Sequence, residues 1–351
     1  MPSVRISDLW TPQIWGNQVR EKQATFPSIL NSAAVMNSPL LGQIASGAGV
    51  AANIPTWRDI TDQADEVQVE ATAPVNTNGI TTSNQVAPIL NRVSKSGVEA
   101  LAAQVSGGDP TEEITLQLAA RRLKQRQSTL IPILRGAFGT SAGAALGNAA
   151  PLAAVRLTIG DETGAGAGAA ELMSPDAFIN AKALMGELAD GLRAGALFMH
   201  STVRATLEKL DASSFKSGIQ SGLPFQIDTY RGVPVFICDA LVRNGTTSGQ
   251  VYDTYLLSNG VIGLGEKPQV VGTIDRPIID VASLNYQADP NTNSEYIYDR
   301  TRVVLHLNGM RWTGSPAAQS ATNAELGTFG NWALAYQSAN RVGAVCIVSN
   351  G

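Results

Sequence analysis

The stretch from Asp109 to Phe138 is the sequence feature that most constrains the fold. Asp109 is a good N-cap residue, Pro110 suits the first helical position, and Glu112 completes a capping-box arrangement. Side chains that suit a buried stripe then recur at alternating spacings of four and three residues: Leu116, Ala120, Leu123, Gln127, Leu130 and Leu134. A helix of about 26 residues is roughly 39 Å long, and Pro132 should kink or shorten its last turn. We expect this helix to be a structural spine.

A long two-stranded arm is expected before the helix, in residues 53–97. Residues 54–57 are strand-like, residues 66–70 alternate polar with apolar, and residues 80–93 return in extended form. The connecting stretch is rich in Thr, Asn, Pro and Gly, which is typical of turns. An isolated hairpin with few large apolar side chains is marginal in water. We therefore expect this arm to lie on another surface.

Residues 1–52 are expected to form an N-terminal arm. Asp8 can cap a short helix that carries Trp10 and Trp15, and Phe26-Pro27 interrupts it. Two tryptophans this near a terminus need a covering surface. We expect that surface to belong to another subunit.

The rest of the chain mixes short helices and strands. Residues 139–170 are rich in Gly and Ala, which predicts a flexible connection or a turn region rather than a packed element. Ser174-Pro175-Asp176 begins a helix that should reach about Leu188, and a short helix is expected near residues 202–210. Short strands are expected at 196–199, 233–238, 252–257, 261–264, 278–286, 296–298, 302–307 and 344–348. Because strands and crossover helices do not alternate regularly, the predicted class is α+β.

The amino-acid composition excludes some classes of function. The 351 residues include 2 His and 2 Cys, which excludes the usual zinc sites of several clustered ligands. The net charge of −4 argues against a basic nucleic-acid-binding surface over the whole protein. Only 15% of the residues are charged, which indicates that much surface is buried against other chains. Cys238 and Cys346 are interpreted as small buried hydrophobic residues.

No secretory signal and no apolar run of about 18 residues is present, so a membrane partner is not expected. The sequence therefore indicates a protein of cytosolic origin.

Catalytic motifs are scarce. A hydrolase triad could use His200 or His306 with Asp239 or Asp299, but no G-x-S-x-G elbow presents a nucleophile. The glycine-rich stretches lack the Lys-Ser/Thr ending of a phosphate-binding P-loop. We therefore predict no catalytic, cofactor-binding or metal-binding residue, and a hydrolase using His200 stays open as an alternative.

Two charge clusters of opposite sign could mediate contact between subunits. The arm carries an acidic run, Asp59, Asp62, Asp65, Glu66 and Glu70, next to Trp57. The long helix carries a basic cluster, Arg121, Arg122, Lys124 and Arg126. One reading is two solvated surfaces; the other is that the acidic limb docks on the basic cluster of a neighbouring subunit, where charge pairs would set register. Reversing Arg121 and Arg122 to Glu should then impair assembly without unfolding the subunit.

Several motifs occur in a fixed order along the chain, from about Ile54 to Val348. They are Gly107-Gly108-Asp109-Pro110, Met199-His200-Ser201, Tyr230-Arg231-Gly232, Tyr252-Asp253-Thr254-Tyr255-Leu256 and Leu305-His306-Leu307-Asn308-Gly309. In this order they resemble the major capsid protein of tailed bacteriophages with the Hong Kong 97-like fold. Leu307 replaces a proline of that family, and residues 139–170 match no feature of it.

The resemblance implies a domain organisation. Residues 1–52 would be the N-terminal arm, 53–97 the E-loop, and 98–170 the peripheral domain with its spine helix at 109–138. Residues 171–270 would form the axial domain, and 271–351 would return to the peripheral domain.

The resemblance also implies a function. Copies of the chain would form the hexamers and pentamers of an icosahedral shell around double-stranded DNA, with separate scaffolding, portal and decoration proteins. The protein would be part of the virion and be made in the bacterial cytoplasm. An encapsulin-type compartment is the alternative with the same fold.

Some relatives crosslink an E-loop lysine to an asparagine. Residues 53–94 contain no lysine, and Lys95 lies at the base of the arm. We therefore expect noncovalent shell contacts or decoration proteins to provide stability.

Overall fold

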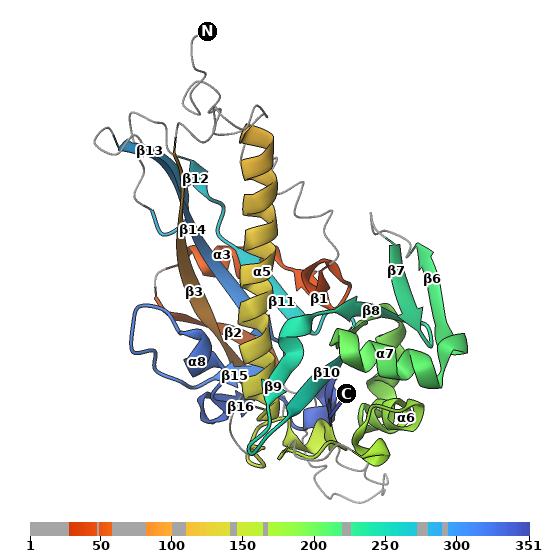
Figure 1. Ribbon diagram of the computed structural model, residues 1–351. Coiled ribbons are helices and arrows are strands. Elements are labelled where there is room, and N and C mark those ends of the chain that lie inside the picture. The colour runs from red at the N-terminus through yellow and green to blue at the C-terminus, as the bar shows by residue number, and fades with distance from the viewer. Residues whose placement is uncertain are drawn as a thin grey trace, which may run out of the picture.

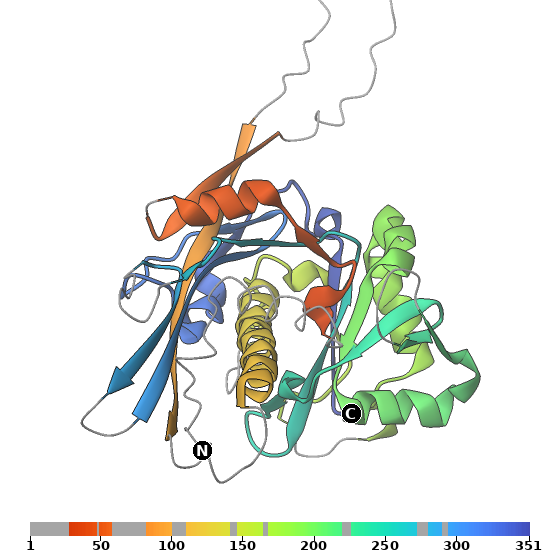
Figure 2. The same ribbon diagram turned by 90° about the horizontal axis from the view of Figure 1, so that it is seen from above.

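Two large sheets lie on either side of one long helix, α5 (Pro110–Phe138) (Figure 1). The structure is a computed structural model that describes residues 28–47, 49–57, 82–99, 110–140, 146–163, 168–219, 226–271, 280–289 and 294–351. Figure 2 looks along α5 and shows strands on both sides of the helix. The mixture of helices and sheets confirms the predicted α+β class, and α5 confirms the helix expected at 109–138.

The first sheet contains the long strands of the molecule. Within the described residues its order is β1-β11-β14-β13-β12, and β3 pairs with both β14 and β2. The bounds are β1 (Val35–Asn37), β2 (Ala51–Trp57), β3 (Thr82–Glu99), β11 (Ile262–Glu266), β12 (Val270–Val271), β13 (Ser283–Asp289) and β14 (Ser294–Leu307). The two strands expected at 296–298 and 302–307 are one continuous strand, β14.

The base of the predicted hairpin arm is present. β2 and β3 pair antiparallel from Ala51↔Pro88 to Trp57↔Thr82, and residues 58–81 lie outside the described residues. Beyond Pro88, β3 leaves β2 and pairs with β14 from Ile89 onward. A proline has no N–H to donate to a ladder, so it is best tolerated where pairing changes partner.

The second sheet has β10 at its centre, and within the described residues its order is β4-β17-β10-β5-β8-β7-β6, with β9 beside β10. The bounds are β4 (Arg156–Thr158), β5 (Ala196–Met199), β6 (Phe215–Ile219), β7 (Gln226–Tyr230), β8 (Val233–Ile237), β9 (Val242–Asn244), β10 (Gln250–Leu257) and β17 (Ala344–Ser349). The hairpin of β6 and β7 was not predicted.

The prediction of a flexible connection at 139–170 is wrong for residues 146–163. There β4 pairs in parallel with β17, and the side chains of Leu152 and Val155 are buried. Small residues allow this segment to pack closely against the second sheet. Residues 141–145 and 164–167 lie outside the described residues.

Short helices and a small hairpin complete the fold. The helices are α3 (Pro39–Ser46), α6 (Pro175–Leu184), α7 (Ser201–Leu210) and α8 (Asn323–Leu326), and β15 (Met310–Trp312) pairs with β16 (Trp332–Leu334). Ser174 caps α6 as expected, accepting a hydrogen bond from the Ala177 N–H. The helix ends earlier than the predicted Leu188 because Gly186 adopts φ +60°, a left-handed conformation that favours glycine.

The long helix is buried on two sides. Leu123, Leu130 and Leu134 of the predicted stripe are buried, but so are Leu118 and Ile133 outside it. A single stripe is the pattern of a helix that covers one surface. Because α5 lies between two sheets, it needs two apolar faces and leaves only a narrow exposed strip.

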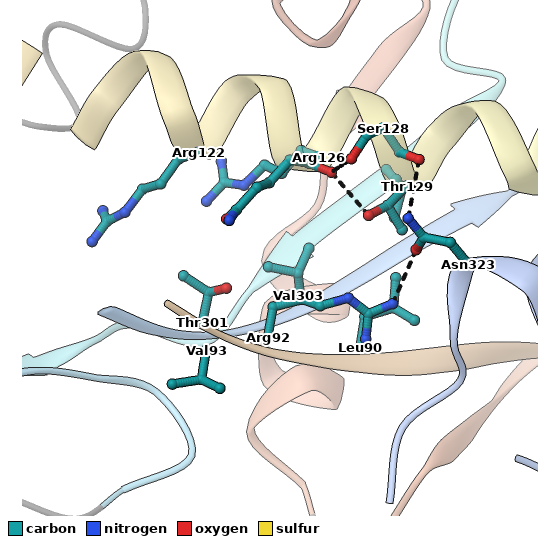
Figure 3. A pocket seen from close by; sticks show the side chains of 12 residues that line it. Leu90, Arg92, Val93, Arg122, Arg126, Ser128, Thr129, Thr301, Val303 and Asn323 are labelled. Carbon is teal, nitrogen blue, oxygen red and sulfur yellow. Dashed lines mark hydrogen bonds between the residues drawn. The ribbon is translucent and has the colours of Figure 1, made fainter. Parts of the chain in front are cut away.

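Pro132 does not end the helix, which continues to Phe138. A proline inside a helix leaves the carbonyl four residues earlier without its usual N–H donor. Here that carbonyl is Ser128 O, and Asn323 Nδ2 of α8 donates to it at 3.4 Å. The expectation that Pro132 would shorten the last turn is therefore wrong, because a side chain from α8 replaces the missing donor (Figure 3).

Candidate assembly surfaces

Arg122 is buried in the protein and is not part of a docking surface. Its guanidinium donates to both carboxylate oxygens of Asp299 on β14, from Nε at 2.8 Å and from an Nη at 2.7 Å. Both side chains are 4% exposed. Gln269 bridges the pair, accepting from Arg122 and donating to Asp299. The hypothesis that Arg122 contacts a neighbouring subunit is therefore wrong, because its charge is neutralised inside the subunit.

Of the other three cations of the cluster, one is paired within the subunit and two are exposed. Arg126 forms an ion pair of 2.6 Å with Glu266 on β11, so it too is engaged within the subunit. Arg121 and Lys124 are exposed, and Arg121 donates to Ser96 Oγ at 2.7 Å. The exposed basic strip of α5 therefore consists of Arg121 and Lys124.

A cavity of about 180 Å³ lies between α5 and the β3–β14 pair (Figure 3). Arg122 and Arg126 line it from the helix, and Arg92 lines it from β3. Its remaining lining residues include Leu90, Val303, Leu305, Thr129, Thr301 and Asn323. The cavity is therefore lined by both apolar and polar side chains.

Arg92 is the cation of this cavity that has no carboxylate partner among the described residues. Its guanidinium donates to Asn91 O, Ser320 Oγ, Ala321 O and Asn323 Oδ1. Burial lowers the pKa of the Arg92 guanidinium. These neutral acceptors tie β3 to the segment before α8.

The predicted contact residues on the arms are mostly beyond the described part of the chain. Trp10 and Trp15 lie outside it, as does the whole acidic run, Asp59, Asp62, Asp65, Glu66 and Glu70. Trp57 is described, at the outer end of β2, and it is 73% exposed. Tryptophan is enriched in protein–protein interfaces, so Trp57 stays a candidate contact residue.

Sequence reasoning missed a second basic and aromatic surface, on the face of β14 that points away from Asp299. Lys95 Nζ lies 3.7 Å from the ring centroid of Tyr296, and the Arg300 guanidinium lies 5.5 Å from that of Tyr298. These side chains alternate with the buried ones along β14. The sequence signal for this surface is the alternation of aromatic or basic residues with buried ones along β14. The apolar run that follows in the same strand hides this alternation.

His200 begins a helix rather than forming a catalytic triad. Its Nδ1 accepts a hydrogen bond from the Thr202 N–H at 3.0 Å, which caps α7. Ser201 Oγ lies 3.5 Å from the same nitrogen, and Asp239 Oδ1 lies 3.7 Å from Nε2. Because Nδ1 already accepts the cap hydrogen bond, its lone pair is not available to take a proton from Ser201.

His306 is a core residue. It is buried, its Nε2 lies 3.1 Å from Gln85 Oε1, and the Gly309 N–H donates to that same oxygen. Burial lowers the pKa of His306 to about 4. The ring is therefore neutral near pH 7 and joins β14 to β3.

A buried charge network connects the end of α5 to the second sheet. Asp253 on β10 accepts from Arg135 Nε at 3.1 Å and from Arg243 Nε at 3.0 Å. Arg243 also pairs with Glu162. Asp253 is completely buried, so both arginines are needed to compensate its charge.

The described residues offer little other chemistry. They contain no group of three or more His, Cys, Asp or Glu that could hold a metal ion. None of the described helices is long and apolar enough to cross a membrane. Cys238 and Cys346 are both buried and unpaired, as predicted.

Comparison with known proteins places this geometry among phage capsids. No family model matches the chain. The chain is 24% identical over 342 residues to the major capsid protein of Bacillus phage SPP1, which covers 96% of this chain and 95% of that protein.

Two solved structures have the same fold. The capsid of Ralstonia phage GP4 has a TM-score of 0.58 at 9% identity and covers 90% of this chain and 87% of its own. The capsid of cyanophage Pam1 has a TM-score of 0.52 at 13% identity, and the match covers 93% of this chain and 92% of the Pam1 chain. The predicted Hong Kong 97-like capsid fold is thereby confirmed.

Proposed function

We propose that this chain, a major capsid protein of the tailed-phage type by sequence and by fold, builds the icosahedral head shell that encloses the double-stranded DNA genome. The observation that carries the proposal is a similarity that runs over 96% of the chain and extends to the fold. The role is structural, and copies of the chain assemble into capsomers as part of the virion.

The architecture supports this function because it separates a rigid body from an arm. The two sheets and α5 share one large apolar core, whereas the base of the arm has a small one. One side of β2 is exposed along its length, and Trp57 at its outer end is uncovered. Contacts of this kind, repeated over many copies, gain strength from closure of the shell.

The domain division follows the same proposal. We assign residues 1–52 to an N-terminal arm, 53–97 to the E-loop, and 98–170 with α5 to the peripheral domain. Residues 171–270 form the axial domain, and 271–351 return to the peripheral domain. β14, which joins the sheet of β3, and β10, which lies in the other sheet, support the division. The sheets also cross its boundaries, because β11 pairs with β14, and β4 and β17 belong to the sheet of β10.

The partners follow from the shell function. Hexamers and pentamers of this chain form the shell, and separate scaffolding, portal and decoration proteins act with it. Packaged DNA lies against the shell without specific contacts, since the subunit has a net charge of −4. Synthesis occurs in the bacterial host cytoplasm.

Expression of the full chain, alone and with its scaffolding protein, followed by electron microscopy tests the shell function. Closed icosahedral particles are expected, and particles from an infection should contain DNA. A soluble monomer at high concentration that never forms particles would overturn the proposal. Particles that hold a cargo enzyme instead would identify an encapsulin-type compartment.

We further propose that the acidic limb, with Asp59, Asp62, Asp65, Glu66 and Glu70, contacts the exposed strip of α5 on a neighbouring copy. The strip supplies Arg121 and Lys124, whose charges have no carboxylate partner among the described residues. Trp57 then packs on the same neighbour, and Trp10 and Trp15 contact another subunit. Such charge pairs fix register more than affinity.

The double variant Arg121→Glu with Lys124→Glu tests this contact. It should fold normally and lose most closed particles, whereas Lys209→Glu, also an exposed cation on a helix, should assemble normally. Adding Asp65→Lys and Glu66→Lys should restore assembly. Normal assembly of the first variant would rule the contact out and leave the shell function standing.

A further inference from the structure

Arg302 is a buried arginine that reaches from β14 to the turn between α3 and β2. It is 6% exposed, and no carboxylate among the described residues pairs with it. Its Nε donates to Ala45 O at 2.7 Å, and one Nη donates to Gly47 O at 2.6 Å and to Gly49 O at 2.9 Å. A buried charge is tolerated only when its donors are satisfied, and here main-chain oxygens satisfy them.

These oxygens belong to the end of a helix and the turn that follows. The last carbonyls of a helix have no partner within it, and they carry partial negative charge. Ile44 O accepts from the Gly47 N–H, and Arg302 takes the next carbonyl, Ala45 O. Arg302 therefore closes the end of α3 and binds Gly47 and Gly49, which lead from α3 to β2.

The turn leads directly into the arm. Gly49 has φ +114°, and β2 begins two residues later at Ala51. The Ile89 N–H donates to Val50 O at 2.8 Å, which joins the turn to β3. The turn is thus fixed by one side chain from β14 and one ladder bond from β3.

The two limbs of the arm are held differently. Ser83 Oγ of β3 donates to Ala335 O at 3.0 Å, and Gln85 of β3 contacts His306, whereas β2 has few contacts with the body. A cluster separate from the main core lies beneath the arm, made of Leu41, Ala45, Ala87, Ile89 and Val304. From β2 itself only Ala52 and Ile54 pack against this cluster, and neither is fully buried. Few apolar contacts leave the direction of a segment weakly determined. The polar contacts of Arg302 therefore have a large share in setting it.

The direction of the arm matters because a small rotation at its base produces a larger displacement at its outer end. β2 has 7 residues, so at about 3.3 Å per residue it is about 23 Å long, and a rotation of about 10° at its base displaces its outer end by about 4 Å. A displacement of that size is larger than the hydrogen-bond distances on which docking depends.

We propose that Arg302 is a positioning residue for assembly: it fixes the direction in which the arm leaves the body, so that the arm reaches its neighbour. The inference rests on the proposed shell function. It assigns to Arg302 a role in the geometry of assembly rather than in the stability of the subunit.

The full-length variants Arg302→Gln and Arg302→Lys test the inference, with Arg300→Gln as the matched control. Arg300 lies two residues earlier on the same face of β14, and it contacts the Tyr298 ring instead of the turn. In Arg302→Gln, amide hydrogen exchange at residues 50–57 should become at least ten-fold faster, while β10 and β17 are unchanged. The yield of closed particles should fall at least ten-fold.

Arg302→Lys keeps the charge but lacks the planar fork that serves several carbonyls, so its effects should be intermediate. It also provides the measurement if Arg302→Gln is insoluble. Arg300→Gln should match the wild type in amide hydrogen exchange at residues 50–57. Arg311→Gln, at an exposed arginine on β15, is the control for assembly and should match the wild type in the yield of closed particles.

Three results would overturn the inference: unchanged exchange at residues 50–57, closed particles of normal diameter and yield, or exchange that rises equally in β10 and β17. Exchange is measured on the unassembled subunit, so it tests Arg302 even if the wild type forms no shell. Failure of the wild type to assemble would instead count against the shell function.

Discussion

Buried arginines organise this subunit at the scale of single residues. Asp299 neutralises Arg122, and Asp253 and Glu162 neutralise Arg243. Arg302 instead donates hydrogen bonds to main-chain oxygens and to Asn91 Oδ1. Arginine suits this use because its planar fork offers several donors at fixed angles. Arg122 and Arg302 connect elements that are far apart in the sequence, and Arg243 joins the neighbouring strands β9 and β10 to Glu162.

Removal of Arg122 should therefore be severe. Arg122→Ala leaves the buried Asp299 carboxylate without its counter-charge, and breaking such a pair destabilises a protein by about 3–5 kcal/mol. Arg121 precedes Arg122 on α5 but is exposed, so Arg121→Ala should change the free energy of unfolding by less than about 0.5 kcal/mol. Urea unfolding of the unassembled subunit measures both variants. Equal changes in the two would contradict the buried ion pair.

His306 should make the subunit sensitive to acid. Its pKa is about 4 in the folded protein, below the ordinary value of about 6.5 that it has in the unfolded chain. Between these values the unfolded state binds the proton and the folded state does not, so stability is lost as pH falls from about 6.5 to 4.

His306→Gln removes the titrating ring but keeps a polar side chain near Gln85. The loss of unfolding free energy between pH 7 and 4.5 should be smaller in this variant by about 2 kcal/mol. Denaturant unfolding at the two pH values measures it. The same pH dependence in wild type and variant would show that other groups cause the acid sensitivity.

At the scale of elements, α5 is defined by having a sheet on each side. Gly136 allows α5 to approach α8 and β16 closely. A Cβ placed there would lie 2.3 Å from Leu326 O and 2.6 Å from Trp332 Nε1. The Trp332 N–H donates to Leu326 O at 2.7 Å, so neither atom can move without losing this hydrogen bond.

Gly136→Ala should destabilise the subunit although alanine favours helices. The propensity gain is about 1 kcal/mol, whereas forcing atoms into a packed interior costs about 1–3 kcal/mol and here also disturbs a buried hydrogen bond. We expect a net loss, seen as a lower midpoint of thermal unfolding. Ser128→Ala, on the exposed side of the same helix, is the control and should be nearly neutral. A raised midpoint for Gly136→Ala would contradict the packing of α5 against β16.

At the scale of the whole molecule, the subunit combines a large core with an arm that has little core of its own. Among the described residues, the large buried cluster lies between the two sheets and α5, whereas the base of the arm has only a small cluster. A shell subunit must occupy slightly different environments, and this division allows it.

The absence of lysine from residues 53–94 predicts how the shell is stabilised. Particles boiled in detergent should run as a monomer on a denaturing gel, because an arm without lysine cannot form the amide crosslink. Untreated particles, run in parallel, should remain at the top of the gel. A ladder of covalent oligomers would contradict noncovalent stabilisation.

The local elements could be read from the sequence because their signals are local. Caps and spacing identified α5, Ser174 identified the start of α6, and apolar runs identified β5 and β17. The order of short motifs indicated the capsid fold before any contact was known.

Tertiary structure alone decided which charges are available. Arg121, Arg122, Lys124 and Arg126 look alike in the sequence, yet two of them face carboxylates on distant strands and two face outward. The continuation of α5 past Pro132 depends in the same way on Asn323, far along the chain. Spacing along a helix gives the direction of each side chain, but what stands opposite it depends on how distant segments pack.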